Sequence, residues 1–205
     1  TFPAEVAAVE FKGFAHGNGE LFMFGTGIST VVTADESILY WSNSSAVWTD
    51  STSKDDALNP EIAWDITGMV EHKGSMYAIN RLSYIPQGSG TTKQVIKGSG
   101  ATSWANTATP TNRPGDNAYH LLSDGTRMYT VVGLTSLLVK QSTDDGVEWA
   151  TGVTINASGR ARGAVIYDDG SASGANDVWV STPEGIFHVD VNSTWASSTF
   201  TKRFT

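Results

Sequence analysis

Residues 141–149 read Gln-Ser-Thr-Asp-Asp-Gly-Val-Glu-Trp, which places a serine, two aspartates, a glycine and a tryptophan close together. A serine beside carboxylates could belong to an active site. The same spacing also suits a tight turn. Asp144 can accept hydrogen bonds from free backbone amides, Gly146 can adopt a positive φ, and Trp149 can bury its ring between hairpins. We therefore interpret Ser142, Asp144, Gly146 and Trp149 as a structural turn.

Residues 167–177 concentrate oxygen ligands of the kind that calcium prefers. The candidate ligands are Asp168, Asp169 and Asp177. This spacing does not match a known calcium-binding loop, and a solvated insertion is the alternative interpretation. We predict no cofactor and no metal site, with calcium at these three aspartates as the alternative.

Composition limits the classes of partner. The chain has 205 residues, of which 40% are hydrophobic and 17% charged, as is typical of a globular protein. Its net charge of −8 argues against general binding to nucleic acid or to anionic membranes. The absence of cysteine excludes disulfides and thiolate chemistry. No apolar run approaches the roughly 18 residues of a membrane span, so we predict no membrane insertion.

The lack of cysteine fits a bacterial exported protein or a virion component. We therefore predict an extracellular, cell-surface or virion location. Because the chain begins with Thr1 rather than Met, we also expect that a preceding segment was removed.

Two sets of aromatic residues repeat along the chain with a common period, which indicates internal repeats. The first set comprises Phe22, Tyr77, Tyr129 and Trp179, at steps of 55, 52 and 50 residues. The second set comprises Trp48, Trp104, Trp149 and Trp195, at steps of 56, 45 and 46 residues.

The pattern within each repeat predicts three strands, followed by a fourth strand that begins at the repeated tryptophan. Apolar and polar residues alternate over four to eight positions, as in half-buried strands. The first strands are expected at 9–15, 66–72, 118–123 and 162–167, the second at 20–25, 75–80, 127–132 and 177–182, and the third at 37–42, 93–98, 137–142 and 185–191. Asn-Gly, Lys-Gly and Asp-Gly turns between first and second strands favour hairpins.

Four antiparallel strands in about 40–50 residues describe one blade of a β-propeller. We predict an all-β fold with four such blades, in a single domain covering residues 1–205. The repeats run roughly from 1–50, 51–106, 107–151 and 152–205, and the N- and C-terminal strands are expected to close the ring. The alternative is a part of a larger propeller.

Residues 142–149 resemble the Asp-box, S/T-x-D-x-G-x-x-W/F, of sialidase-like propellers, also called BNR repeats. All four defining positions match, and shorter versions occur at 42–48, 98–104 and 190–195. The resemblance implies that the box joins the third and fourth strands of a blade, on the face opposite the ligand site.

Sialidases of this family carry an arginine triad, a Tyr–Glu nucleophile pair and an acidic Asp. The first arginine normally lies in an Arg-Ile-Pro type motif near the start. That motif is absent here, because Pro3 has no arginine beside it. We therefore predict a non-catalytic member of the family, with no catalytic residue, and not an enzyme.

Two groups of residues are candidates for ligand binding. In a propeller the loops after the second and fourth strands share one face, where an arginine fork suits a carboxylate or phosphate. Arg81, Arg113, Arg160 and Arg162 would edge that face, although surface ion pairs are the alternative explanation. Trp41, Trp64 and Tyr84 are aromatic residues that could stack on sugars or anchor protein contacts. Packing between blades is the alternative for these three.

The leading prediction of function is a non-catalytic extracellular recognition or structural module, such as a bacterial surface, filament or phage tail component. It would assemble through contacts with other protein chains, and self-assembly is one form that such contacts could take. The alternative is a lectin-like propeller that binds a glycan or anionic ligand. A sialidase-like glycoside hydrolase is a more distant alternative.

Overall fold

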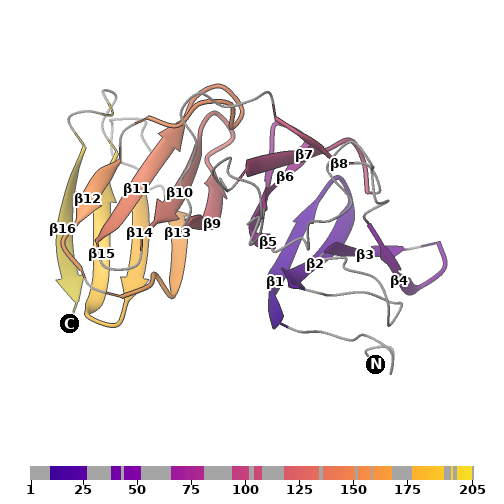
Figure 1. The fold of residues 1–205 in the computed structure, drawn as a ribbon, viewed down its shortest axis with the longest axis horizontal. Coiled ribbons are helices and arrows are strands. Elements are labelled where there is room, and N and C mark those ends of the chain that lie inside the picture. Colours follow the sequence, from indigo (N-terminus) through magenta and orange to yellow (C-terminus); the bar gives the residue numbers. More distant parts are fainter. Residues whose placement is uncertain are drawn as a thin grey trace, which may run out of the picture. The chain divides into compact units, whose positions relative to one another are not determined.

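The structure is a computed structural model that describes residues 10–26, 38–42, 44–51, 66–80, 94–101, 104–107, 118–133, 136–150, 152–157, 159–167, 177–191, 195 and 198–204. The chain forms two compact units, Thr1–Pro110 and Thr111–Thr205. Each unit contains two four-stranded antiparallel sheets made of consecutive strands (Figure 1).

The first unit holds the first and second sheets. The first sheet contains β1 (Glu10–Gly17), β2 (Glu20–Thr26), β3 (Ile38–Ser42) and β4 (Val47–Asp50). The second sheet contains β5 (Ile66–His72), β6 (Ser75–Asn80), β7 (Gln94–Gly98) and β8 (Trp104–Asn106). Phe22, Phe24 and Ile38 of the first sheet share one apolar core with residues of the second, such as Met76 and Ile96.

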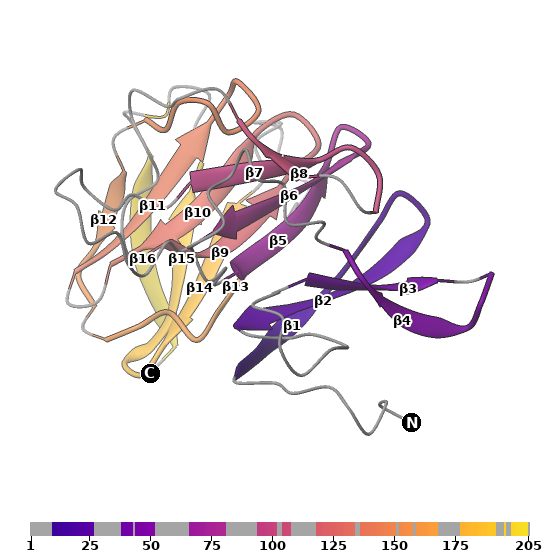
Figure 2. The same cartoon turned by 45° about the vertical axis from the view of Figure 1, so that its right-hand side comes forward.

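The second unit holds the third and fourth sheets. The third sheet contains β9 (Ala118–Ser123), β10 (Met128–Val132), β11 (Leu137–Ser142) and β12 (Val153–Ile155). The fourth contains β13 (Gly163–Tyr167), β14 (Asp177–Thr182), β15 (Gly185–Asp190) and β16 (Thr199–Phe204). The two sheets lie one over the other in Figures 1 and 2. Tyr129, Val139, Val180 and Phe187 are among the residues of the core between them.

The hairpin turns follow two patterns. Asn18 and Gly19 have φ of 55° and 77°, and Lys73 and Gly74 have φ of 49° and 72°. Two successive positive φ angles form the two-residue turn that matches strand twist. The Asp-Gly turn differs, because β9 and β10 are joined by the four residues 124–127. Asp124 Oδ1 accepts hydrogen bonds from the amides of Thr126 (2.8 Å) and Arg127 (2.6 Å), which stabilises the longer loop.

The fold class is confirmed: the protein is all-β and consists of four sheets that each have the strand order of a propeller blade. The predicted first, second and third strands match the observed ones to within one or two residues. Closure of the ring by pairing of the N- and C-terminal strands stays a prediction. Among the described residues, each of these strands is seen to pair within its own sheet, β1 with β2 and β16 with β15. Within the described residues, no helix is both long enough and apolar enough to cross a membrane.

The fourth strands required a correction. Trp104 opens β8 and Trp48 is the second residue of β4, as the repeat predicted. Trp149 and Trp195, however, each precede the start of the fourth strand of their blade by four residues. In these two blades the chain therefore passes the tryptophan before it rejoins the sheet.

Candidate functional site

The loop after β11 forms a compact hydrogen-bonded turn. Ser142 Oγ donates to Asp144 Oδ1 (2.8 Å) and accepts from the Gly146 amide (2.9 Å), while the same Asp144 oxygen accepts from the Glu148 amide (2.9 Å). Gly146 has a φ of 85°. Trp149 is fully buried, and its Nε1 donates to the Gly146 carbonyl over 3.2 Å. The serine and the aspartate are thus engaged in holding the turn.

The arginine candidates are only partly placed. Arg81 and Arg113 lie outside the described residues. Arg160 and Arg162 are exposed and belong to the loop that joins the third sheet to the fourth. The guanidinium carbon of Arg160 lies 5.1 Å from the centre of the Tyr119 ring, so this arginine is held against β9 by a cation–π contact.

His120 follows Tyr119 on β9 and contacts the same loop. Its Nε2 lies 3.4 Å from the carbonyl oxygen of Ala161, to which a protonated Nε2 can donate. Burial lowers the pKa of His120 below its usual value of 6.5, and the hydrogen bond to Ala161 only partly opposes this.

This lowered pKa predicts a loss of stability in acid. Below pH 6.5 the unfolded chain takes up a proton at His120 that the folded chain does not bind, so the free energy of unfolding falls as the pH falls. We expect the native protein to lose more stability than the His120→Gln variant between pH 7.5 and 5.5. Urea unfolding at a series of pH values measures this, and parallel curves for the two proteins would contradict it.

The aromatic candidates are likewise only partly placed. Trp64 and Tyr84 lie outside the described residues. Trp41 is half-buried on β3 and packs edge-to-face against Trp48, with ring centres 5.6 Å apart. It is therefore part of an aromatic cluster on the first sheet and does not stand on a loop.

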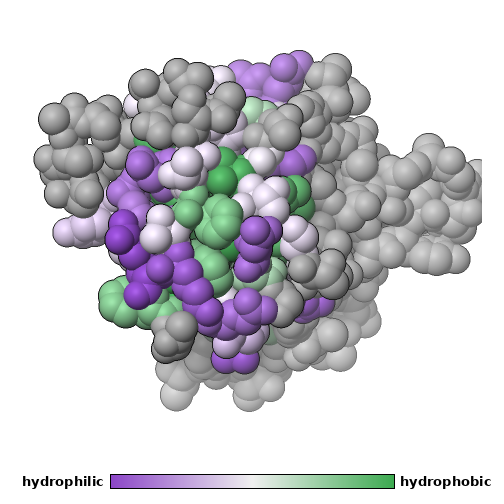
Figure 3. Space-filling view, turned by 90° about the vertical axis from the view of Figure 1, so that its left-hand side faces the viewer, coloured by the Kyte–Doolittle hydropathy of each residue, from purple (hydrophilic) through white to green (hydrophobic). Residues whose placement is uncertain are grey.

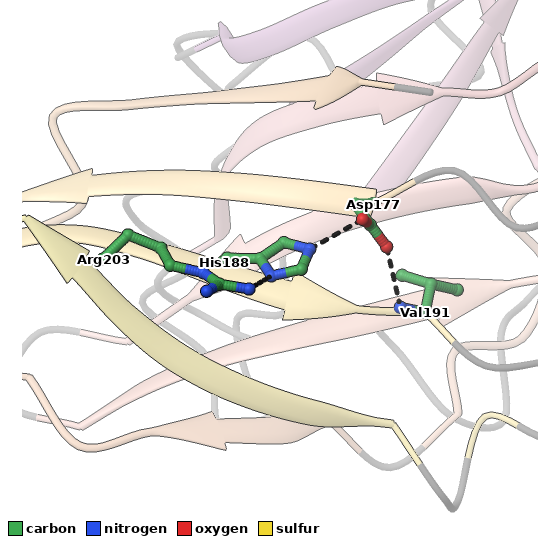
Figure 4. A network of polar contacts seen from close by, with 4 residues as sticks. All are labelled: Asp177, His188, Val191 and Arg203. Carbon is green, nitrogen blue, oxygen red and sulfur yellow. Dashed lines mark hydrogen bonds and ion pairs between the residues drawn. The ribbon is translucent and has the colours of Figure 1, made fainter. Parts of the chain in front are cut away.

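Of the calcium candidates, Asp168 and Asp169 lie outside the described residues. Asp177 is buried at the start of β14, where its Oδ2 lies 2.7 Å from His188 Nε2 and its Oδ1 accepts from the Val191 amide (3.4 Å) (Figure 4). On the other side of the ring, the guanidinium of Arg203 donates to His188 Nδ1 over 3.2 Å. Asp177 thus has protein partners for both oxygens.

Metal binding is not indicated elsewhere in the described part of the chain. There, no group of three or more His, Asp or Glu side chains is close enough together to hold an ion.

A groove opens between β12 and β16, at the outer edges of the third and fourth sheets. Its volume is about 910 Å³, which lies within the roughly 300–1,000 Å³ of ligand pockets. Its lining combines apolar groups with hydroxyls, and comprises Ala150, Gly152, Val153, Thr154, Trp195, Ser198, Thr199 and Phe200. Figure 3 shows this side of the molecule, where hydrophobic residues gather in the middle and hydrophilic residues surround them.

The two rings in the groove are supported from beneath. Trp195 and Phe200 are partly buried and pack against the core of the second unit. The ring of Trp195 is centred 6.1 Å from that of Tyr129, and the ring of Phe200 is centred 6.4 Å from that of Phe187. Because Tyr129 and Phe187 are buried, they fix the orientation of the rings that face the groove.

These groove residues were not among the sites predicted from sequence. Trp195 was interpreted as a repeated packing residue, like Trp149, but it is only half-buried. A signal was present: residues 190–195 have no glycine before the tryptophan, whereas Gly146 supplies the positive φ of 85° in the turn before Trp149.

Comparison with known proteins identifies the fold. No protein-family model matches the sequence, and no curated protein sequence matches it either. Among solved structures, the chain is similar to a GH43 glycoside hydrolase engineered to display both endo-xylanase and exo-arabinofuranosidase activity, with a TM-score of 0.53 and 17% identity. The match covers 98% of this chain and 41% of the hydrolase. The hydrolase is a propeller, so the likeness shows a propeller fold.

This comparison corrects the prediction that the protein is not an enzyme. A solved structure with a matching fold is that of a glycoside hydrolase, so the prediction is wrong in excluding catalysis. A purely structural, non-catalytic role has no support from it either. Membership of the Asp-box group stays a prediction, because the likeness extends to the propeller fold and no further.

Proposed function

We propose that this protein recognises a neutral glycan in the groove between β12 and β16. The observation that carries the proposal is the composition of the groove, which pairs two fixed aromatic rings with three hydroxyl side chains. The propeller fold, which the chain shares with a glycoside hydrolase, supports a glycan over other small ligands.

The chemistry of the groove suits a sugar ring. Trp195 and Phe200 offer flat apolar surfaces for the C–H face of a sugar, and their support from the core keeps them in place before a ligand arrives. Thr154, Ser198 and Thr199 each bring a hydroxyl that can donate or accept hydrogen bonds with sugar hydroxyls.

The lack of charge in the groove favours a neutral sugar. None of its described lining residues is charged. A carboxylate or sulfate buried there would lose hydration without gaining a partner, and the net charge of −8 would also repel it. Arg160 and Arg162, which were predicted to bind an anionic ligand, do not line this groove. An anion bound in the groove would therefore contact neither of these two arginines.

A panel of oligosaccharides tests the proposal. Neutral glycans, including xylo- and arabino-oligosaccharides, would be compared with matched uronate-containing and sialylated ones by isothermal titration. We expect binding of at least one neutral glycan and none of its acidic counterpart. Binding of acidic glycans alone would contradict the proposal. Measuring the reducing ends released from each bound glycan then decides whether the protein also hydrolyses what it binds.

A further inference from the structure

A second, smaller cavity lies beside the groove between β12 and β16. Its volume is about 170 Å³, and it is lined by Gln141, Thr143, Asp144, Glu148, Trp149 and Ala150, which together define the side pocket. Ala150 lines both cavities, so they meet at this residue. The third sheet holds Ala150 in place, because its amide donates to the Gln141 carbonyl over 2.8 Å. A ligand in the groove can therefore extend past Ala150 into the side pocket.

The side pocket differs from the groove in its chemistry. The groove is lined by apolar groups and hydroxyls, whereas the side pocket contains the carboxylates of Asp144 and Glu148 and the amide of Gln141. A hydrogen bond to an ionised carboxylate is roughly twice as strong as one between two neutral groups. The side pocket therefore suits the hydroxyls of a sugar, while the rings in the groove suit its apolar face.

Gln141 is a buried polar residue in the lining of the side pocket. Its exposed fraction is 5%. Among the described residues its side chain makes one hydrogen bond, from Nε2 to the Tyr129 hydroxyl over 3.4 Å. A glutamine amide can donate two hydrogen bonds and accept two, so further positions remain for a partner in the cavity. A sugar hydroxyl fits these positions because it both donates and accepts.

Tyr129 connects the side pocket to the groove. Its hydroxyl accepts from Gln141 Nε2 and donates to Asp124 Oδ2 over 2.9 Å, which fixes its position. Its ring is centred 6.1 Å from that of Trp195 in the groove. One buried tyrosine thus contacts a polar group of the side pocket and an aromatic ring of the groove. Groups that are held in place before binding reduce the entropy that a ligand must overcome.

Asp144 uses one of its carboxylate oxygens in the turn after β11. Oδ1 accepts from Ser142 Oγ and from the Glu148 amide. No residue in the described part of the chain donates to Oδ2, and the side chain is exposed. Because the turn holds Oδ1, it also fixes the direction of Oδ2. This oxygen can therefore accept from a sugar hydroxyl while the turn stays intact.

We propose that the side pocket is a second subsite for the glycan that the groove recognises. One unit of a neutral oligosaccharide packs against Trp195 in the groove, and the hydroxyls of a further unit bind Gln141 and Asp144. The proposal rests on the proposed function and adds the size of the ligand, which must contain at least two linked sugars. At this second position the carboxylates of Asp144 and Glu148 repel a uronate.

A series of chain lengths tests the proposal. The neutral glycan that binds best would be titrated into the native chain as oligomers of one to six sugar units, with affinity measured by calorimetry. We expect the affinity to rise by about tenfold or more when the oligomer is long enough to reach the side pocket, because new hydrogen bonds form there. Longer oligomers should then bind with similar affinity.

Two substitutions locate this gain in affinity. Gln141→Leu removes the amide and keeps a side chain of similar size, and Asp144→Asn removes the charge but keeps an oxygen for the turn. We expect each variant to bind the shortest oligomers like the native chain and to lose most of the gain with length. Thr130→Val is the control, since it removes a buried hydroxyl of the same sheet that lines neither cavity. Melting curves confirm that each variant is folded.

Four results would overturn the proposal. An affinity that does not rise with length would show that the side pocket is unused, while the groove remains the glycan site. A gain that both folded variants keep would place the additional contacts elsewhere. Loss of the gain in Thr130→Val as well would show a general effect of altering the third sheet. If the folded native chain bound no oligomer of any length, the proposed function of the groove would be wrong, and the second subsite with it.

Discussion

Replacing Trp149 by alanine is expected to lower the free energy of unfolding by about 3–5 kcal/mol. The side chain is fully buried, and its removal leaves a large cavity at the end of the third sheet. It also leaves the Gly146 carbonyl without the 3.2 Å hydrogen bond from the indole. Because small domains are stable by only about 5–15 kcal/mol, this loss is a large fraction of the total. Urea unfolding followed by circular dichroism measures it.

A matched substitution provides the control. Trp48 occupies the same repeat position in the first sheet but is only half-buried, so Trp48→Ala should cost about 1–2 kcal/mol. Trp149→Phe keeps most of the packing, so its loss of unfolding free energy should lie between those of the two alanine variants. Equal losses of unfolding free energy for Trp149→Ala and Trp48→Ala would show that the burial of the repeated tryptophan does not determine how much it stabilises the protein.

Trp195→Ala is expected to weaken glycan binding by about 30-fold or more, which corresponds to about 2 kcal/mol. The substitution removes the larger of the two rings that face the β12–β16 groove. Titration calorimetry with the best neutral glycan of the panel measures the loss. Because the Trp195 ring also packs near Tyr129, the variant must first be shown to keep its fold by its melting curve.

Trp41→Ala serves as the control for this prediction. It removes an equally large ring from the aromatic cluster of the first sheet, and Trp41 is not among the residues that line the groove. We expect glycan affinity to stay within about twofold of the native value, a difference below 0.5 kcal/mol. If Trp41→Ala abolished binding and Trp195→Ala preserved it, the glycan site would lie on the first sheet.

The strands could be predicted from sequence because apolar residues alternate within short runs and the runs repeat. The turn at residues 142–149 could also be predicted, since the preferences of Ser, Asp and Gly in a turn depend on neighbouring residues alone. The length of the Asp124 loop could not, because Asp-Gly is compatible with a two-residue turn as well as with the observed four residues.

The groove could not be predicted from sequence, because it lies between β12 and β16, two edge strands that are distant in sequence. Thr154 and Thr199 come from different sheets, and only the packing of those sheets brings them together.

The position of the bound glycan decides whether the groove between β12 and β16 is the binding site. The native chain, labelled with ¹⁵N, would be titrated with the best neutral glycan of the panel while its backbone amide signals are followed by NMR. We expect the largest shifts at the amides of Thr154, Ser198 and Phe200, which line the groove. Shifts concentrated at Arg160 and Arg162, with the groove amides unchanged, would contradict it.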